Sequence, residues 1–146
     1  MNDIVVTVIG NVCHEVRHTV RDDGLHIASF RLAHTPRRFN RTAGNWEDGD
    51  TVFLTVTCWR WLAENVASSV TKGDPVMVTG RLKVREWERD GVRNRSIEVD
   101  ATSVGHDLSK GVSSFRRPRR LDAGQLSAEL ALVAAENEQA GSGVAA

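Results

Sequence analysis

Short runs of alternating apolar and polar residues dominate the first 106 positions of the chain. A strand sends alternate side chains to opposite faces, so runs of this kind predict half-buried strands. Turn signals separate the runs, among them the Asp-Gly pair at 90–91, which is typical of a tight hairpin. The pattern predicts strands over residues 4–12, 25–33, 51–59, 75–87 and 96–105.

One segment changes period. Between residues 61 and 70, Leu62, Val66 and Val70 recur at helical spacing and predict a short amphipathic helix. The polar segment 35–50 predicts a protruding loop or a long hairpin. Three strands, a helix and two strands is the element order of the OB-fold, an all-β, five-stranded Greek-key barrel. An SH3-like barrel is the competing small barrel, but a helix between the third and fourth strands favours the OB-fold.

Composition changes after about residue 110. We expect residues 1–110 to form the OB-fold domain and residues 111–146 to form a low-complexity tail. A short helix near 125–136 would be marginal, because the sequence shows no surface for it to pack against. The formal net charge of zero conceals an asymmetry. All 19 basic residues and 15 of the 19 acidic ones lie in residues 1–120, whereas residues 121–146 hold four acids and no base. A basic domain with an acidic tail does not exclude a nucleic-acid partner.

The fourth predicted strand, in "RLKVREWERDG" (81–91), places cations and a tryptophan on one face. A solvated surface would lack the large aromatic side chain, and a core would lack the cations. The aliphatic Leu82 and Val84 share the opposite parity and are predicted to face inward. The residues of the aromatic and basic face are Arg81, Lys83, Arg85, Trp87 and Arg89.

The third predicted strand, residues 51–59, repeats this division. Phe53 and Trp59 share one parity with two threonines and are predicted to face outward. Two separate strands therefore combine an aliphatic inner face with an aromatic outer face. The inward parity, predicted to form core, is Val52, Leu54, Val56 and Cys58.

An aromatic and basic outer face is typical of a surface for single-stranded nucleic acid. Bases stack on the rings while phosphates pass along arginine and lysine side chains. Duplex DNA hides its base faces and would use exposed rings poorly. Phe39, beside Arg37 and Arg38 in segment 35–50, fits the same interpretation. The alternative is that Trp59 and Trp87 pack within the barrel or between subunits.

Five segments resemble the bacterial single-stranded DNA-binding proteins over roughly residues 1–106: "VIGNV", "FRLA", "WLAENV", "KGDPVMVTGRLKVREW" and "SIEVDATSVG". The resemblance implies a homotetramer of OB-folds around which single-stranded DNA wraps, protecting it in replication, recombination, repair or chromosome segregation. By motif position it places the stacking aromatics at Phe39, Phe53, Trp59 and Trp87. It places the backbone contacts at Arg37, Arg38, Arg81, Lys83 and Arg85.

The tail departs from the family pattern. Typical members end in a glycine- and proline-rich linker with an acidic tip that recruits repair and replication proteins, whereas this chain ends "GSGVAA". The chain is similar to a second, specialised paralogue of the kind that actinobacteria carry. We expect it not to recruit repair proteins through an acidic tip.

Other signals are weaker. "CHEVRH" (13–18) brings Cys13, His14 and His18 close in sequence, but strand side chains would not converge and no second ligand pair follows, so neither metal nor cofactor is expected. No nucleophile motif or phosphate loop indicates an enzyme. The N-terminus has no signal-peptide pattern and no long apolar run, which predicts a cytoplasmic, nucleoid-associated protein without a membrane partner. An RNA-binding OB-fold protein or a protein-interaction module would use the same aromatic face, so both alternatives stay open.

Overall fold

The computed structural model describes residues 2–118 and 123–143, about half of them in β-strands. The elements in chain order are β1 (Val5–Val12), β2 (Arg17–Val20), β3 (His26–His34), β4 (Arg37–Asn40), β5 (Asn45–Asp48), β6 (Val52–Trp59), α1 (Arg60–Ser69), β7 (Pro75–Arg89), β8 (Val92–His106) and α2 (Ala123–Gly143).

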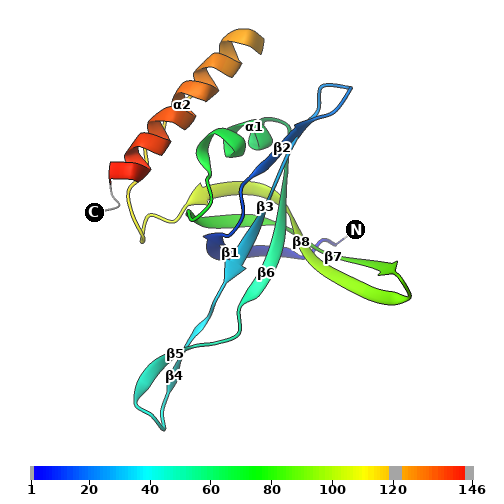
Figure 1. Cartoon of the computed structure of the whole chain (residues 1–146), viewed down its shortest axis with the longest axis vertical. Helices are drawn as coiled ribbons and strands as arrows, with labels where there is room; N and C mark the ends of the chain where they lie inside the picture. The colour runs from blue at the N-terminus through cyan, green and yellow to red at the C-terminus, as the bar shows by residue number, and fades with distance from the viewer. Residues whose placement is uncertain (1, 119–122, 144–146) are drawn as a thin grey trace.

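Five of these strands form a closed barrel. The main sheet has the order β1-β7-β8-β6-β3-β2, and a further pairing of β1 with β3 joins its two sides. β6 and β8 run parallel, whereas the other ladders are antiparallel. The barrel strands β1, β3, β6, β7 and β8 match the five predicted ones, with α1 between the third and fourth (Figure 1). The predicted OB-fold is confirmed.

Barrel closure depends on two glycines where strands approach closely. A Cβ atom on Gly10 would lie 2.4 Å from the carbonyl oxygen of Ala33, because β1 changes partner from β7 to β3 near this point. A Cβ atom on Gly80 would lie 2.1 Å from the carbonyl oxygen of Asp100. The β7–β8 register shifts between Thr79 and Gly80, which marks a bulge that bends the strand.

The core consists of inward side chains from the barrel strands and one side of α1. Its largest fully buried members are Val12, Leu32, Val56, Val76, Val78, Val99 and Cys58. Burial raises the pKa of the Cys58 thiol to about 12, because desolvation disfavours the thiolate. Cys58 is therefore a small protonated hydrophobe inside the barrel, as its parity predicts.

Two side chains predicted to lie inside are exposed. Val84 is 55% exposed, because the distal part of β7 extends past the barrel as one side of a hairpin. Val52 is also exposed, because its pair with His34 is the last of the β3–β6 ladder. The inward parity of both strands is correct, but neither position has a barrel layer above it.

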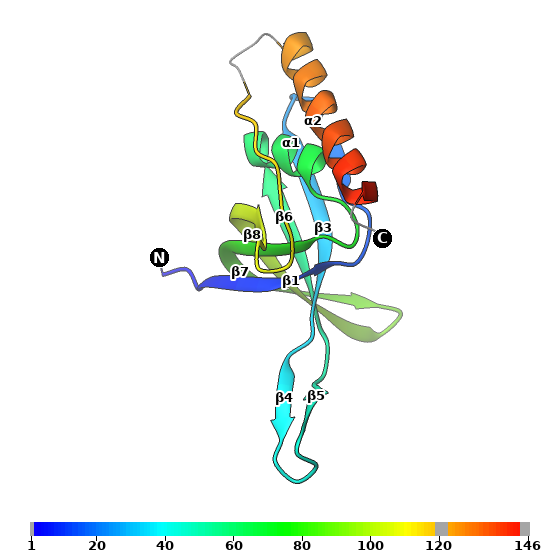
Figure 2. The ribbon, with the colours of Figure 1, turned by 90° about the vertical axis from the view of Figure 1, so that its left-hand side faces the viewer.

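Two hairpins project from the barrel (Figures 1 and 2). Segment 35–50 forms the β4–β5 hairpin, in which the rings of Phe39 and Trp46 meet edge to face at 5.5 Å between centroids. The β7–β8 hairpin turns at Asp90 and Gly91, whose φ values of 53° and 76° suit the tight turn that an Asp-Gly pair predicts. β8 begins at residue 92, earlier than the predicted 96, which makes this second arm long.

Helix α2 lies alongside α1 at the end of the molecule opposite the β4–β5 hairpin (Figures 1 and 2). It runs over 21 residues, longer than the short helix considered near 125–136. α1 supplies the packing surface that the sequence does not show, and Arg116 and Glu136 form an ion pair between the preceding segment and α2. Within the described residues, no helix is long and apolar enough to cross a membrane.

The turn from β6 into α1 contains a strained residue. Arg60 has a φ of 58°, in the left-handed region that costs a residue with a Cβ atom about 1–2 kcal/mol. Arg60→Gly should therefore raise the free energy of unfolding by about 0.5–1 kcal/mol. Thermal or urea unfolding at fixed protein concentration measures this gain. Arg60→Ala keeps the strain and serves as the control, so an equal gain in both variants would contradict the explanation.

Candidate nucleic-acid interface

Strand register places the outward residues of β6 and β7 on one surface. Thr55 on β6 pairs with Glu98 on β8, and Glu98 pairs with Lys83 on β7. Residues paired across neighbouring strands share a face, so the surface runs without a break from β3 to β7. We call it the outer face; its members are Ser29, Arg31, Phe53, Thr55, Thr57, Trp59, Arg81, Lys83, Arg85, Trp87, Arg89, Asn94, Ser96, Glu98 and Asp100.

The three aromatic rings of the outer face are accessible to solvent. Trp59 and Trp87 are each 40% exposed and Phe53 is 48% exposed. The alternative that the two tryptophans pack inside the barrel is therefore wrong. The alternative that they pack between copies of the chain stays open. A flat ring that is half open to water can accept a second flat group on its free side.

Arginine guanidinium groups lie over two of these rings. The Cζ atom of Arg85 is 5.5 Å from the ring centroid of Trp87. The Cζ atom of Arg31 is 5.3 Å from the ring centroid of Phe53. Both distances are within the range of a cation–π contact. The outer face thus brings a cation and an aromatic ring together at two separate places.

Carboxylates occupy the middle of the outer face. Asp100, only 9% exposed, forms a close ion pair with the Nζ atom of Lys83 and a longer one, 3.9 Å, with Arg81. Arg81 also lies 3.8 Å from Asp3, and Glu98 follows Asp100 on the same face. Two of the cations assigned to DNA backbone contacts are therefore partly neutralised within the chain.

The remaining three sequence candidates lie away from the outer face, on the β4–β5 hairpin, which is a separate two-stranded sheet. Phe39 is half exposed and shares one side of this hairpin with Arg37, because strand neighbours alternate. Arg38 lies on the other side. Arg37 forms an ion pair with Asp48 at 3.5 Å.

The site residues predicted from the sequence do not include Arg31, Glu98 and Asp100, which belong to the outer face. Arg31 could have been found, because it alternates with two apolar residues, Phe30 and Leu32, that are buried. Glu98 and Asp100 also alternate with apolar residues, Ile97 and Val99, but their place beside β6 depends on the parallel pairing of β8 with β6.

The segment "CHEVRH" does not form a cluster. The Cys13 thiol donates to the carbonyl oxygen of Arg31 at 3.3 Å, whereas His18 and His26 share a hydrogen bond of 2.9 Å between ring nitrogens. The Nε2 atom of His26 lies 2.9 Å from a carboxylate oxygen of Glu64. No group of three or more His, Cys, Asp or Glu side chains in residues 2–118 and 123–143 is arranged to hold a metal ion.

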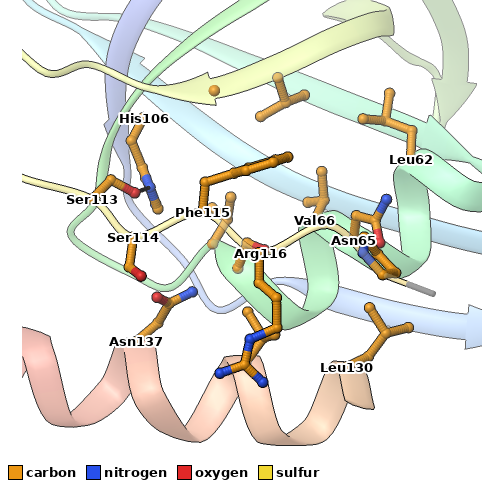
Figure 3. A pocket seen from close by; sticks show the side chains of 16 residues that line it. Leu62, Asn65, Val66, His106, Ser113, Ser114, Phe115, Arg116, Leu130 and Asn137 are labelled. Atoms are coloured by element: carbon orange, nitrogen blue, oxygen red, sulfur yellow. Dashed lines mark hydrogen bonds between the residues drawn. The ribbon is translucent and has the colours of Figure 1, made fainter. Parts of the chain in front are cut away.

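A cavity of about 370 Å³ lies between α1, residues 113–118 and α2 (Figure 3). Leu62, Val66 and Leu130 contribute apolar lining, and at its edge a ring nitrogen of His106 and the hydroxyl of Ser113 are 2.6 Å apart. None of its lining residues belongs to the outer face. The cavity is separate from the candidate interface.

An OB-fold barrel that exposes aromatic rings beside cations has the architecture of proteins that bind single-stranded nucleic acid. The family model described as "Single-strand binding protein family" matches residues 1–107. The chain belongs to this family, which confirms the resemblance seen in the sequence.

Curated relatives and solved structures agree with this assignment. The chain is 48% identical over 122 residues to single-stranded DNA-binding protein 2 of Streptomyces avermitilis, covering 84% of this chain and 77% of the relative. It is 44% identical over 121 residues to the single-stranded DNA-binding protein of Corynebacterium glutamicum, covering 82% and 54%.

Two solved structures are similar. One is the small single-stranded DNA-binding protein from Streptomyces coelicolor, with a TM-score of 0.69, 42% identity, and coverage of 76% of this chain and 100% of that chain. The other is the second single-stranded DNA-binding protein from Mycobacterium smegmatis, with a TM-score of 0.63, 32% identity, and coverage of 80% and 100%.

Proposed function

We propose that this protein binds single-stranded DNA with little sequence preference and catalyses no reaction. The observation that carries the proposal is the outer face, on which Phe53, Trp59 and Trp87 are exposed beside arginines. Every base has a flat π-face, so stacking on these rings discriminates weakly between sequences. Such binding would protect single strands in replication, recombination, repair or chromosome segregation. The proposed contact residues are Phe39, Phe53, Trp59, Trp87, Arg37, Arg38, Arg81, Lys83 and Arg85.

The β4–β5 hairpin would extend the path of the DNA beyond the barrel. Phe39 and Arg37 share one side of this arm, which offers a further ring and a further cation to a strand that leaves the outer face. Arg38 lies on the other side of the arm, so we expect it to contribute less than Arg37 to any one bound strand.

We propose that the protein assembles as a homotetramer. Support comes from exposed apolar side chains on the outward side of β1 and β7, where Ile9 pairs with Met77 and Val5 lies further along β1. The Thr7–Thr79 pair lies between them. Exposed apolar residues on a regular sheet suit packing against a second copy of the same surface. Static light scattering should give the mass of four chains.

Two further proposals concern the cell. We propose that the protein acts in the cytoplasm at the nucleoid, where its DNA ligand is. We also propose that it does not recruit repair proteins through an acidic tip. Support comes from residues 123–143, which form helix α2 alongside α1. A pull-down that recovered repair proteins through residues 121–146 would overturn this second proposal.

A fluorescence titration tests the proposed function. Stacking of bases on Trp59 and Trp87 should quench intrinsic tryptophan fluorescence strongly with poly(dT), while duplex DNA of equal length competes poorly. Raising salt should weaken binding, because binding releases counterions from the phosphates and this release is less favourable at higher salt concentration. Equal affinity for duplex and single strands would contradict stacking. Preference for poly(U) over poly(dT) would favour the RNA alternative, and absence of quenching by either would favour a protein partner.

Removing the buried carboxylate should strengthen DNA binding. Asp100→Asn releases Lys83 from its partner and removes one of the two carboxylates beside Arg81, so Lys83 above all becomes available to phosphates. The slope of log K against log salt should steepen by about 0.7 for each cation that gains a phosphate. Salt titrations of poly(dT) affinity measure the effect, and circular dichroism checks the fold. Asp23→Asn, which releases Arg21 away from the outer face, is the matched control. A flatter slope in Asp100→Asn would contradict the proposed role of these cations.

A further inference from the structure

Five cations lie on the outer face. Arg89 is next to the turn of the β7–β8 hairpin, and the other four fall into two pairs. Arg81 and Lys83 share the carboxylate of Asp100. Within the described residues, neither Arg31 nor Arg85 forms an ion pair; instead, each places its guanidinium group over an aromatic ring. A cation–π contact at an exposed site is weaker than a hydrogen bond between two charged groups. Of these four, Arg31 and Arg85 are therefore the cations that a phosphate could take over most readily.

The position of Arg31 is fixed by its own backbone. Its carbonyl oxygen accepts hydrogen bonds from the backbone N–H and the thiol of Cys13, at 2.9 Å and 3.3 Å. The β3–β6 ladder places Arg31 opposite Thr55, next to the pair that Ala33 makes with Phe53. The side chain is exposed and reaches diagonally across the ladder to the Phe53 ring.

The guanidinium group of Arg31 covers a ring that faces solvent. A base that stacks on that side of Phe53 must displace it, and the displaced cation then lies beside the sugar and phosphate of the same nucleotide. Arg85 and Trp87 repeat this arrangement on β7, with nearly the same distance between guanidinium and ring. Each pair holds the two groups that a nucleotide requires, a flat surface for the base and a planar cation for the phosphate.

We infer that Arg31 is a further DNA-binding residue, which moves from the Phe53 ring to a phosphate when a base stacks there. The inference rests on the proposed function and adds a cation from β3 to a face whose other cations all come from β7. It also places a phosphate contact on each side of the two β8 carboxylates, Glu98 and Asp100. The bound strand would then cross the outer face between two arginine–aromatic pairs, with Glu98 and Asp100 beneath it.

Substitution of Arg31 tests this inference. Arg31→Met removes the charge but keeps a long side chain over Phe53. Its affinity for a fluorescein-labelled dT oligonucleotide should fall about fivefold to tenfold at low salt. The slope of log K against log salt should flatten by about 0.7, the value for one phosphate of a single strand. Arg31→Lys retains the charge, so its salt slope should equal that of the wild type.

Arg93→Met is the matched control, because Arg93 lies on the opposite face of the β7–β8 hairpin and should change neither affinity nor slope. If the wild type binds DNA and the affinity and salt slope of Arg31→Met equal those of Arg93→Met, the role of Arg31 is overturned. The proposed function then still stands. Equal losses in Arg31→Met and Arg31→Lys at an unchanged slope would show that Arg31 only packs on Phe53, which also overturns the inference. Failure of the wild type itself to bind would overturn both proposals.

Discussion

Trp87→Ala is expected to weaken binding of single-stranded DNA by about 1–3 kcal/mol, the usual contribution of one stacked base. The ring stands on the β7–β8 hairpin, outside the barrel core, with Arg85 over it. Removing the ring takes away a stacking surface and leaves the cation in place. Trp87→Phe should recover part of the loss, because a smaller π-face remains. Anisotropy of a fluorescein-labelled dT oligonucleotide measures affinity without depending on the tryptophans.

Stability and mass must be measured on the same samples, because packing between copies predicts a different result. If Trp87 packs between subunits, Trp87→Ala should dissociate the assembly in light scattering or lower the melting temperature. Trp61→Ala is the matched control, since Trp61 is exposed on α1 and is not a member of the outer face. A folded, correctly assembled Trp87→Ala protein with undiminished affinity would end the claim that this ring stacks a base.

Gly80→Ala is expected to destabilise the barrel by about 3 kcal/mol or more, a large effect for one methyl group. The added carbon would lie 2.1 Å from the carbonyl oxygen of Asp100 and 2.8 Å from the Cα atom of Ala101. Both contacts are with backbone, so no side chain can rotate to relieve them. The β7–β8 ladder must open at the bulge, which also displaces the carboxylate that holds Lys83.

Thermal unfolding at fixed protein concentration measures this loss. Gly111→Ala is the control, because Gly111 has no positive φ and a Cβ atom there would meet nothing within 4 Å. A Gly80→Ala protein as stable as Gly111→Ala would show that β7 and β8 can separate at the bulge without cost. It would also show that Gly80 is not required for barrel closure.

Most of the barrel could be predicted from local sequence, because its strands alternate in polarity and its helix has its own period. Leu54, Val56 and Cys58 are buried as their parity requires. The limits of the barrel could not be predicted in this way. Val84 continues the inward parity of Leu82 but lies on an arm with nothing packed over it, and only the three-dimensional path of β7 shows where the barrel ends.

The residues of the candidate site also differ in how far local sequence predicts them. Parity alone finds Phe53, Trp59 and Trp87, because an aromatic side chain opposite an aliphatic face is a local signal. The charge of the face is not a local property. By its parity Lys83 faces outward, where it could bind a phosphate. It nevertheless forms an ion pair with Asp100 on β8, the strand that follows the hairpin turn. Which carboxylate meets which cation depends on the register of the β7–β8 hairpin, and the two-residue turn at Asp90-Gly91 sets that register by pairing Arg89 with Val92. Counting back from this turn places Asp100 opposite Arg81, a step that parity within one strand does not supply.

The barrel cannot close during protein synthesis until β8 has been made, because β8 pairs with β6 as well as with β7. β8 is the last barrel strand to be made, and it completes ladders with both β6 and β7. At a translation rate of about 5–20 residues per second, the earlier strands wait seconds for their final partner. Until then β6 and β7 have open hydrogen-bonding edges, the kind of surface at which nascent chains associate wrongly. Long-range ladders also close slowly in β-barrels. The period before β8 is made is therefore the one in which this chain is most exposed to misassembly with neighbouring nascent chains.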